Sequence, residues 1–200
     1  MMRRRAFGTL ALIALAGCAR DGETPSSSRP VPASGAPETD YSRPLSAVMD
    51  ILRTGGVSLY LAHPGVIGDA LSDLGRQVAT EVGEAFAALD VEVTVTTSPA
   101  PYCRETADVA FAGSEATVDD LLGDLSDAEG REDQVTAHAA KRLASSVPWG
   151  EVAVLIGHPG NITAVTGVPV NEGEGLICAR AGGSFQVLAE TMPNDWARMK

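Results

Sequence analysis

The stretch Leu59-Tyr60-Leu61-Ala62-His63-Pro64-Gly65 is an apolar run that ends at a histidine in a Pro-Gly turn. A second stretch, Val152-Ala153-Val154-Leu155-Ile156-Gly157-His158-Pro159-Gly160-Asn161, repeats this pattern. Short, continuous apolar runs are typical of buried strands in a parallel sheet. Because open α/β sheets bind ligands at the carboxyl ends of their strands, the two histidines predict one shared site. Taken singly, each histidine is also compatible with a structural residue that is merely hydrogen-bonded at a strand end.

Apolar spacing along the rest of the chain predicts alternating helices and strands. The predicted helices are 45–52, 73–89 (capped by Ser72), 102–111, 131–147 and a short one after His158; the further strands are 91–97 and a hairpin of 176–180 with 185–189. The acidic residues 113–133 predict a solvated surface segment with one helical turn at 118–122, and 193–196 predict a polar ending. This order predicts a single α/β domain over residues 44–200, a three-layer α/β/α sandwich with a mostly parallel sheet.

The N-terminus has the pattern of an export signal. Three arginines at 3–5 precede a short apolar run that ends Leu15-Ala16-Gly17-Cys18, which resembles a bacterial lipobox. The resemblance implies that residues 1–17 are removed and that Cys18 carries the lipid. An ordinary secretory signal with a chance cysteine is the alternative. Residues 18–43 are rich in Pro, Ser and Gly and predict a disordered tether, so the domain is expected in the cell envelope, on the periplasmic face of a membrane (the outer one in a Gram-negative cell).

Composition excludes some partners. The formal net charge is −11, and no cluster of Lys and Arg provides a face for nucleic acid. No Cys/His spacing typical of a metal site occurs. With Cys18 lipidated, Cys103 and Cys178 remain as an even pair, which the sequence allows either as a disulfide or as two separate buried thiols.

Four motifs, in order over residues 45–196, resemble the histidine phosphatase superfamily and its phosphoglycerate mutase-like fold. They are Leu61-Ala62-His63-Pro64, Leu71-Ser72-Asp73-Leu74-Gly75-Arg76-Gln77-Val78-Ala79, Thr97-Ser98-Pro99 followed by Arg104-Glu105-Thr106-Ala107, and Gly157-His158-Pro159-Gly160-Asn161. The resemblance implies that His63 is a phosphate-accepting nucleophile and His158 a phosphate ligand. It implies a phosphorylated small molecule or another anion as ligand, and no cofactor.

The chain departs from the family pattern where the phosphate is held. Ala62 and Tyr102 occupy the two positions at which the family has arginines. Arg104 and Asn161 are the remaining candidates for phosphate contacts, and Asp124 and Glu105 are the candidates for the general acid. Arg104 is two residues from Tyr102, and helical positions two apart do not share a face. His138 is expected to be structural or exposed.

Two functions follow as hypotheses. Loss of both arginines favours a degenerate phosphatase-like domain on a lipoprotein, which acts as a ligand-binding or scaffold module. The alternative is an active phosphomonoesterase that works through phospho-His63.

Overall fold

The computed structural model describes residues 40–200, so the predicted signal peptide, Cys18 and most of the predicted tether lie outside the described residues. A central sheet has the strand order β5-β4-β6-β1-β7-β8. Its strands are β1 (Val57–Ala62), β4 (Glu92–Thr97), β5 (Thr117–Val118), β6 (Glu151–Gly157), β7 (Gly175–Ala181) and β8 (Ser184–Thr191). The first four run parallel, and β7 pairs antiparallel with both β1 and β8, so the predicted mostly parallel sheet is confirmed.

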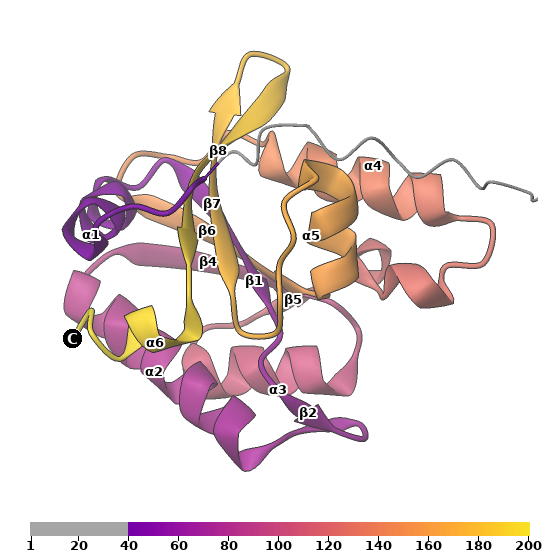
Figure 1. Cartoon of the computed structure of the whole chain (residues 1–200), viewed down its shortest axis with the longest axis horizontal. Helices are drawn as coiled ribbons and strands as arrows, with labels where there is room; N and C mark the ends of the chain where they lie inside the picture. The colour runs from indigo at the N-terminus through magenta and orange to yellow at the C-terminus, as the bar shows by residue number, and fades with distance from the viewer. Residues whose placement is uncertain (1–39) are drawn as a thin grey trace, which may run out of the picture. The chain divides into compact units, whose positions relative to one another are not determined.

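Helices cover both faces of this sheet (Figure 1). The helices are α1 (Leu45–Thr54), α2 (Asp73–Leu89), α3 (Pro101–Ala110), α4 (Glu132–Leu143), α5 (Pro159–Thr166) and α6 (Pro193–Trp196). Side chains of β1 divide between two cores, because successive residues of a strand point to opposite faces. Leu59 and Leu61 join the core with α1, α2, α3 and α6, whereas Tyr60 and Ala62 join the core with α4 and α5. The predicted three-layer sandwich is therefore confirmed.

Local sequence signals account for most element ends. Ser72 caps α2 as predicted, and its hydroxyl accepts a bond from the Gly75 amide at 3.0 Å. A small antiparallel pair, β2 (Val66–Ile67) with β3 (Ala70–Leu71), leads from His63 to that cap and was not predicted.

Cys103 and Cys178 are free buried thiols that belong to different cores, so the disulfide alternative is wrong. No helix within residues 40–200 is long and apolar enough to cross a membrane.

Two segments that were predicted to be solvated contribute to the core. Residues 113–133 contain β5 and two 3₁₀ turns, η1 (Asp120–Leu122) and η2 (Leu125–Asp127), and Leu122 is fully buried. The predicted polar ending is wrong as well, because Trp196 and Met199 are both 0% exposed. Trp196 stacks on Phe86 of α2 with ring centroids 6.1 Å apart. Short segments with one large apolar residue have no periodicity from which burial can be read.

The two tryptophans of the chain provide a test of this ending. Trp196→Ala should lower the free energy of unfolding by about 3–5 kcal/mol, because it empties a fully buried aromatic site. Urea unfolding followed by circular dichroism measures the change. Trp149→Ala is the matched control, since Trp149 is 82% exposed, and it should cost about 0.5 kcal/mol or less. Equal losses in the two variants would contradict a docked C-terminus.

Candidate functional site

The two histidines that ended the quoted stretches lie together at one edge of the sheet. Strands β1 and β6 pair in parallel with Ala62 opposite Gly157, and the His63 amide donates to the Gly157 carbonyl at 2.9 Å. This register places the rings of His63 and His158 with their centroids 5.4 Å apart. Both residues are buried, at 5% and 1% exposure. The structure therefore brings together the pair that the sequence predicted.

His63 is held by its own turn. Its Nδ1 lies 3.2 Å from the Pro64 carbonyl oxygen, which can only accept a hydrogen bond. This contact assigns the ring proton to Nδ1 and leaves the lone pair on Nε2. The Gly173 amide lies 3.1 Å from the His63 carbonyl oxygen and fixes the backbone from the other side. The turn and the Gly173 amide thus fix the His63 ring with Nδ1 against the Pro64 carbonyl oxygen and Nε2 without a contact from that turn.

His158 is engaged by protein groups at both ring nitrogens. Nε2 lies 2.9 Å from the Ser98 hydroxyl, and Nδ1 lies 3.3 Å from an Asp124 carboxylate oxygen. Its backbone is fixed by Tyr60, whose buried hydroxyl accepts from the His158 amide at 3.0 Å and donates to its carbonyl at 3.2 Å. Glycine is required at 157 because a Cβ there would overlap this hydroxyl. Neither ring nitrogen of His158 is left over for an added ligand in this arrangement.

Asp124 reaches His158 because Asn161 orders the segment that carries it. The Asn161 side chain accepts from the Leu125 amide at 2.9 Å and donates to the Gly123 carbonyl at 2.7 Å. It is 0% exposed and fully committed to these contacts. Asn161 is therefore a positioning residue, and the prediction that it contacts phosphate finds no support in this geometry.

Tyr102 occupies the space between the histidines and solvent. Its ring centroid lies 4.6 Å from that of His63 and 5.8 Å from that of His158, in edge-to-face contacts. The hydroxyl is 3.5 Å from His158 Nδ1, a long contact that adds little energy. Position 102, where the family pattern has a phosphate-binding arginine, thus does face the site, but it presents a neutral phenol.

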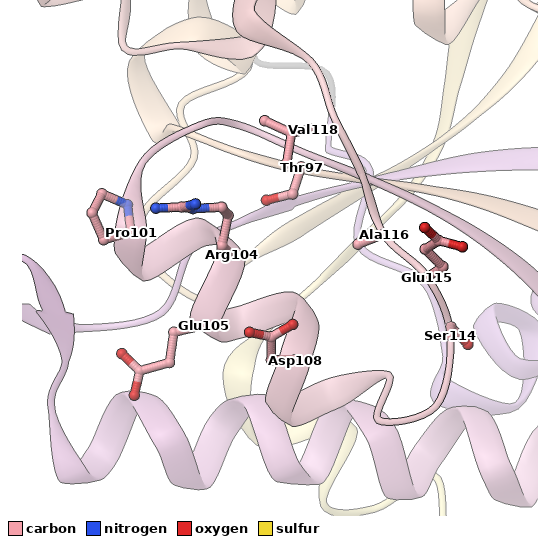
Figure 2. Close-up of a pocket in the computed structure, with 9 residues that line it drawn as sticks. All are labelled: Thr97, Pro101, Arg104, Glu105, Asp108, Ser114, Glu115, Ala116 and Val118. Carbon is pink, nitrogen blue, oxygen red and sulfur yellow. The ribbon is translucent and has the colours of Figure 1, made fainter.

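Arg104 and Glu105 do not belong to this site. Arg104 is exposed and lines a separate cavity with Thr97, Pro101 and Val118, on another side of α3 (Figure 2). Glu105 points toward α2 (Figure 2). Its carboxylate accepts from the Leu71 amide of β3 at 2.8 Å and from Arg76 of α2 at 2.7 Å. These bonds hold the pKa of Glu105 below its ordinary value. The helical period of α3 directs Arg104 away from the face that carries Tyr102, and Glu105 is engaged by Leu71 and Arg76, so their predicted roles as phosphate ligand and acid find no support in this geometry.

The cavity beside His158 is acidic. It has a volume of about 340 Å³, and its lining includes Ser98, Tyr102 and His158. The charged residues of the lining are Asp120, Asp124, Asp127 and Arg131. Three carboxylates against one guanidinium disfavour the binding of a second anion. Ala62, the other position of a lost arginine, is 0% exposed within the α4–α5 core.

Burial and charge set the protonation of the central pair. Burial lowers the pKa of His158, while Asp124 raises it and His63 lowers it, so that it lies below its ordinary value. Burial raises the pKa of Asp124, but the bonds from Ser126 and the nearby histidines lower it by more, and its net shift is downward. At neutral pH the pair is therefore a neutral imidazole beside an ionised carboxylate.

Sequence reasoning missed Ser98 and Tyr60 as members of this site. Ser98 follows strand β4 directly, as His63 and His158 follow β1 and β6, so its place at a strand end was a usable signal. Tyr60 lies inside an apolar strand, and nothing in the local pattern distinguishes its hydroxyl from a packing residue. His138, predicted to be structural, bonds Asp119 at 2.8 Å and so links α4 to the 113–133 segment.

Two solved structures illustrate the likeness in fold. A phosphoserine phosphatase from Entamoeba histolytica, in complex with 3-phosphoglyceric acid, aligns with a TM-score of 0.51 at 12% identity over 70% of this chain and 98% of its own. An Escherichia coli protein proposed to be an alpha-ribazole-5'-P phosphatase aligns with the same TM-score, identity and coverage. The fold is phosphoglycerate mutase-like. The neighbours belong to the histidine phosphatase family. No protein-family model and no curated protein sequence matches the chain.

The burial of His158 predicts a defined pH dependence. Since the pKa of His158 is lowered in the folded chain, the unfolded chain binds more protons between that lowered pKa and the ordinary value of about 6.5. The free energy of unfolding should therefore fall as the pH drops through this interval. Nitrogen NMR of the imidazole rings, of which the chain has three, measures the pKa directly.

Two substitutions distinguish the effect of the Asp124 charge on the pKa of His158 from the effect of the other charges in the cavity. Asp124→Asn should lower the pKa of His158 further, because the nearest carboxylate no longer favours the imidazolium. Asp120→Asn, in the same cavity lining, serves as the matched control and should shift it much less. A His158 pKa above its ordinary value in the unaltered protein would contradict this description.

Proposed function

We propose that this chain is a lipid-anchored, phosphatase-like domain of the cell envelope whose histidine site has lost phosphate transfer and acts as a ligand-binding or scaffold module. The observation that carries the proposal is the replacement of the phosphate-binding charges around His63 and His158. Ala62 and Tyr102 stand at the two arginine positions of the family pattern, and the Asp124 carboxylate lies 3.3 Å from His158.

The energetic consequence is large. A hydrogen bond to a charged group contributes roughly 1.5–3 kcal/mol, and each arginine makes two such bonds to phosphate. Losing both arginines costs on the order of 6 kcal/mol of transition-state stabilisation, which corresponds to about 10⁴-fold in rate. Asp124, a candidate for the general acid, has a lowered pKa, so its ionised carboxylate adds repulsion between like charges instead.

The alternative function is an active phosphomonoesterase, and one observation favours it. His63 keeps its proton on Nδ1, so that Nε2 retains the lone pair a nucleophile needs. The neighbours in fold are phosphatases, which agrees with either function.

Turnover of p-nitrophenyl phosphate by residues 44–200 separates the two functions. We expect the unaltered protein to show no more turnover than the His63→Ala variant. The single variant Tyr102→Arg and the double variant Ala62→Arg with Tyr102→Arg should both show turnover. Because Ala62 is fully buried, an arginine there can unfold the protein. The double variant is therefore used only if its melting temperature is close to that of the unaltered protein, and the test otherwise relies on the single variant. Turnover by the unaltered protein that His63→Ala abolishes would establish the phosphomonoesterase instead.

The anchor is tested separately in cells that process bacterial lipoproteins. Cys18→Ala should move the protein from the membrane fraction to the soluble fraction, because the acyl chains that hold it have no attachment site. An exposed-serine change, Ser114→Ala, is the control and should leave the protein membrane-bound. Membrane association of Cys18→Ala equal to that of the control would contradict lipid anchoring.

A further inference from the structure

The side chains of Ser98, His158 and Asp124 lie in a row. The Ser98 hydroxyl is 2.9 Å from His158 Nε2, and the Asp124 carboxylate is 3.3 Å from Nδ1 of the same ring. A hydroxyl, an imidazole and a carboxylate in this order form the arrangement that activates a serine for acyl transfer. We propose that these three residues form a hydrolytic triad that cleaves carboxylic esters, with Ser98 as the nucleophile. This goes beyond the proposed function and does not depend on phosphate chemistry at His63.

Each member has the protonation state that the role requires. Asp124 is ionised at neutral pH and accepts only, so it holds the His158 proton on Nδ1. Nε2 then carries a lone pair directed at the Ser98 hydroxyl, and burial keeps His158 neutral and able to take a proton. Asn161 fixes the segment that carries Asp124, which is the support that a preorganised triad needs.

The fold places the triad at a point suited to a developing oxyanion. Ser98 follows β4 and precedes α3, and His158 follows β6 and caps the start of α5. The Ser98 amide donates to the Ile156 carbonyl at 2.9 Å, which ties the two strand ends together. The starts of α3 and α5 are the positive ends of their helix dipoles, which favour negative charge, although the Cys103 and Asn161 amides are already bonded to the Ala100 and His158 carbonyls.

The buried thiols are not competing nucleophiles. Burial raises the pKa of Cys103 to about 12, and burial raises that of Cys178 to about 12 as well. Both remain protonated at neutral pH and unreactive. Of the candidate nucleophiles in this core, the Ser98 hydroxyl is the one with a base in contact.

Charge selects the class of ester. The cavity is lined by Asp120, Asp124 and Asp127 against Arg131, so a neutral or cationic ester is favoured and an anionic one is repelled. Ser98 lines this cavity and is 0% exposed. Tyr102 and His158 line the same cavity, so an ester that enters it meets the Ser98 hydroxyl and its base together.

The reaction balances without a cofactor. The Ser98 oxygen forms a bond to the ester carbonyl carbon while its proton passes to His158 Nε2. The bond from that carbon to the alcohol oxygen then breaks, and the alcohol leaves with the proton from His158. Water attacks the acyl-serine, gives a proton to His158, and the acid departs as Ser98 regains its proton. The net change is ester plus water to acid plus alcohol.

The first experiment locates the nucleophile in the unaltered residues 44–200. A fluorophosphonate probe, which modifies activated serines, is added and the labelled peptide is identified by mass spectrometry. We expect the label on Ser98. A label on another residue, or no label after prolonged exposure, would overturn the triad even if none of its variants folds.

The second experiment measures hydrolysis of p-nitrophenyl acetate. Ser98→Ala, His158→Gln and Asp124→Asn should each lower kcat/KM by about 10²-fold or more, because a triad acts as a unit. The first control is Ser114→Ala, which changes an exposed serine. The second is His138→Gln, which breaks another histidine–aspartate pair, that of His138 Nε2 and the Asp119 carboxylate at 2.8 Å. Losses in the controls equal to those in the triad variants would overturn the proposal.

Substrate class and the proposed loss of phosphatase activity are read separately. Acetylthiocholine should be cleaved with a higher kcat/KM than the anionic p-nitrophenyl hemisuccinate, and the reverse order would overturn the assignment of a neutral or cationic substrate. Failure of the proposed function appears as p-nitrophenyl phosphate turnover that requires His63, whereas failure of the triad appears as missing Ser98 labelling. Phosphate turnover at His63 does not remove the Ser98 label, and a missing Ser98 label does not create phosphate turnover, so the two failures can be told apart.

Discussion

The parallel pairing of β1 with β6 is the constraint on which this site depends. Because Ala62 lies opposite Gly157, the next residue of each strand is a histidine, and both rings leave the sheet at the same edge. A shift of register by one residue would turn one ring to the other face. Tyr60 reinforces the pairing from within β1 by bonding the amide and the carbonyl of His158 across the strand boundary. One strand pair and one buried hydroxyl thus fix the centre of the site.

The cavity beside this centre has more negative than positive side chains. Positions 62 and 102 carry no positive charge, and the Asp124 carboxylate lies 3.3 Å from His158. Asn161 holds Asp124, Asp124 orients His158, and His158 meets Ser98, so each contact supports the next. A half-satisfied network of buried polar groups would be costly, and this one is complete. These contacts occupy both ring nitrogens of His158.

The strands and the two histidines could be read from sequence because buried parallel strands are continuous apolar runs with abrupt ends. The Ser72 cap and the absence of arginine at positions 62 and 102 could also be read from the sequence around them. Asp124 was named, but its contact with His158 depends on Asn161, which is 37 residues away in the chain as counted from the sequence. Leu122 and Trp196 are single apolar residues in polar surroundings, and only tertiary packing shows that they are buried. The errors therefore lie where a long-range contact, rather than a local period, decides the position.

We propose that the histidine pair does not bind phosphate. Nitrogen NMR of the imidazole rings during a titration with inorganic phosphate measures such binding directly. We expect the Nε2 resonances of His63 and His158 to stay unchanged at millimolar phosphate, because Ser98 and Asp124 occupy His158 and three carboxylates outweigh the one guanidinium of the cavity. Saturable shifts of both Nε2 resonances, with a dissociation constant in the micromolar range, would contradict it.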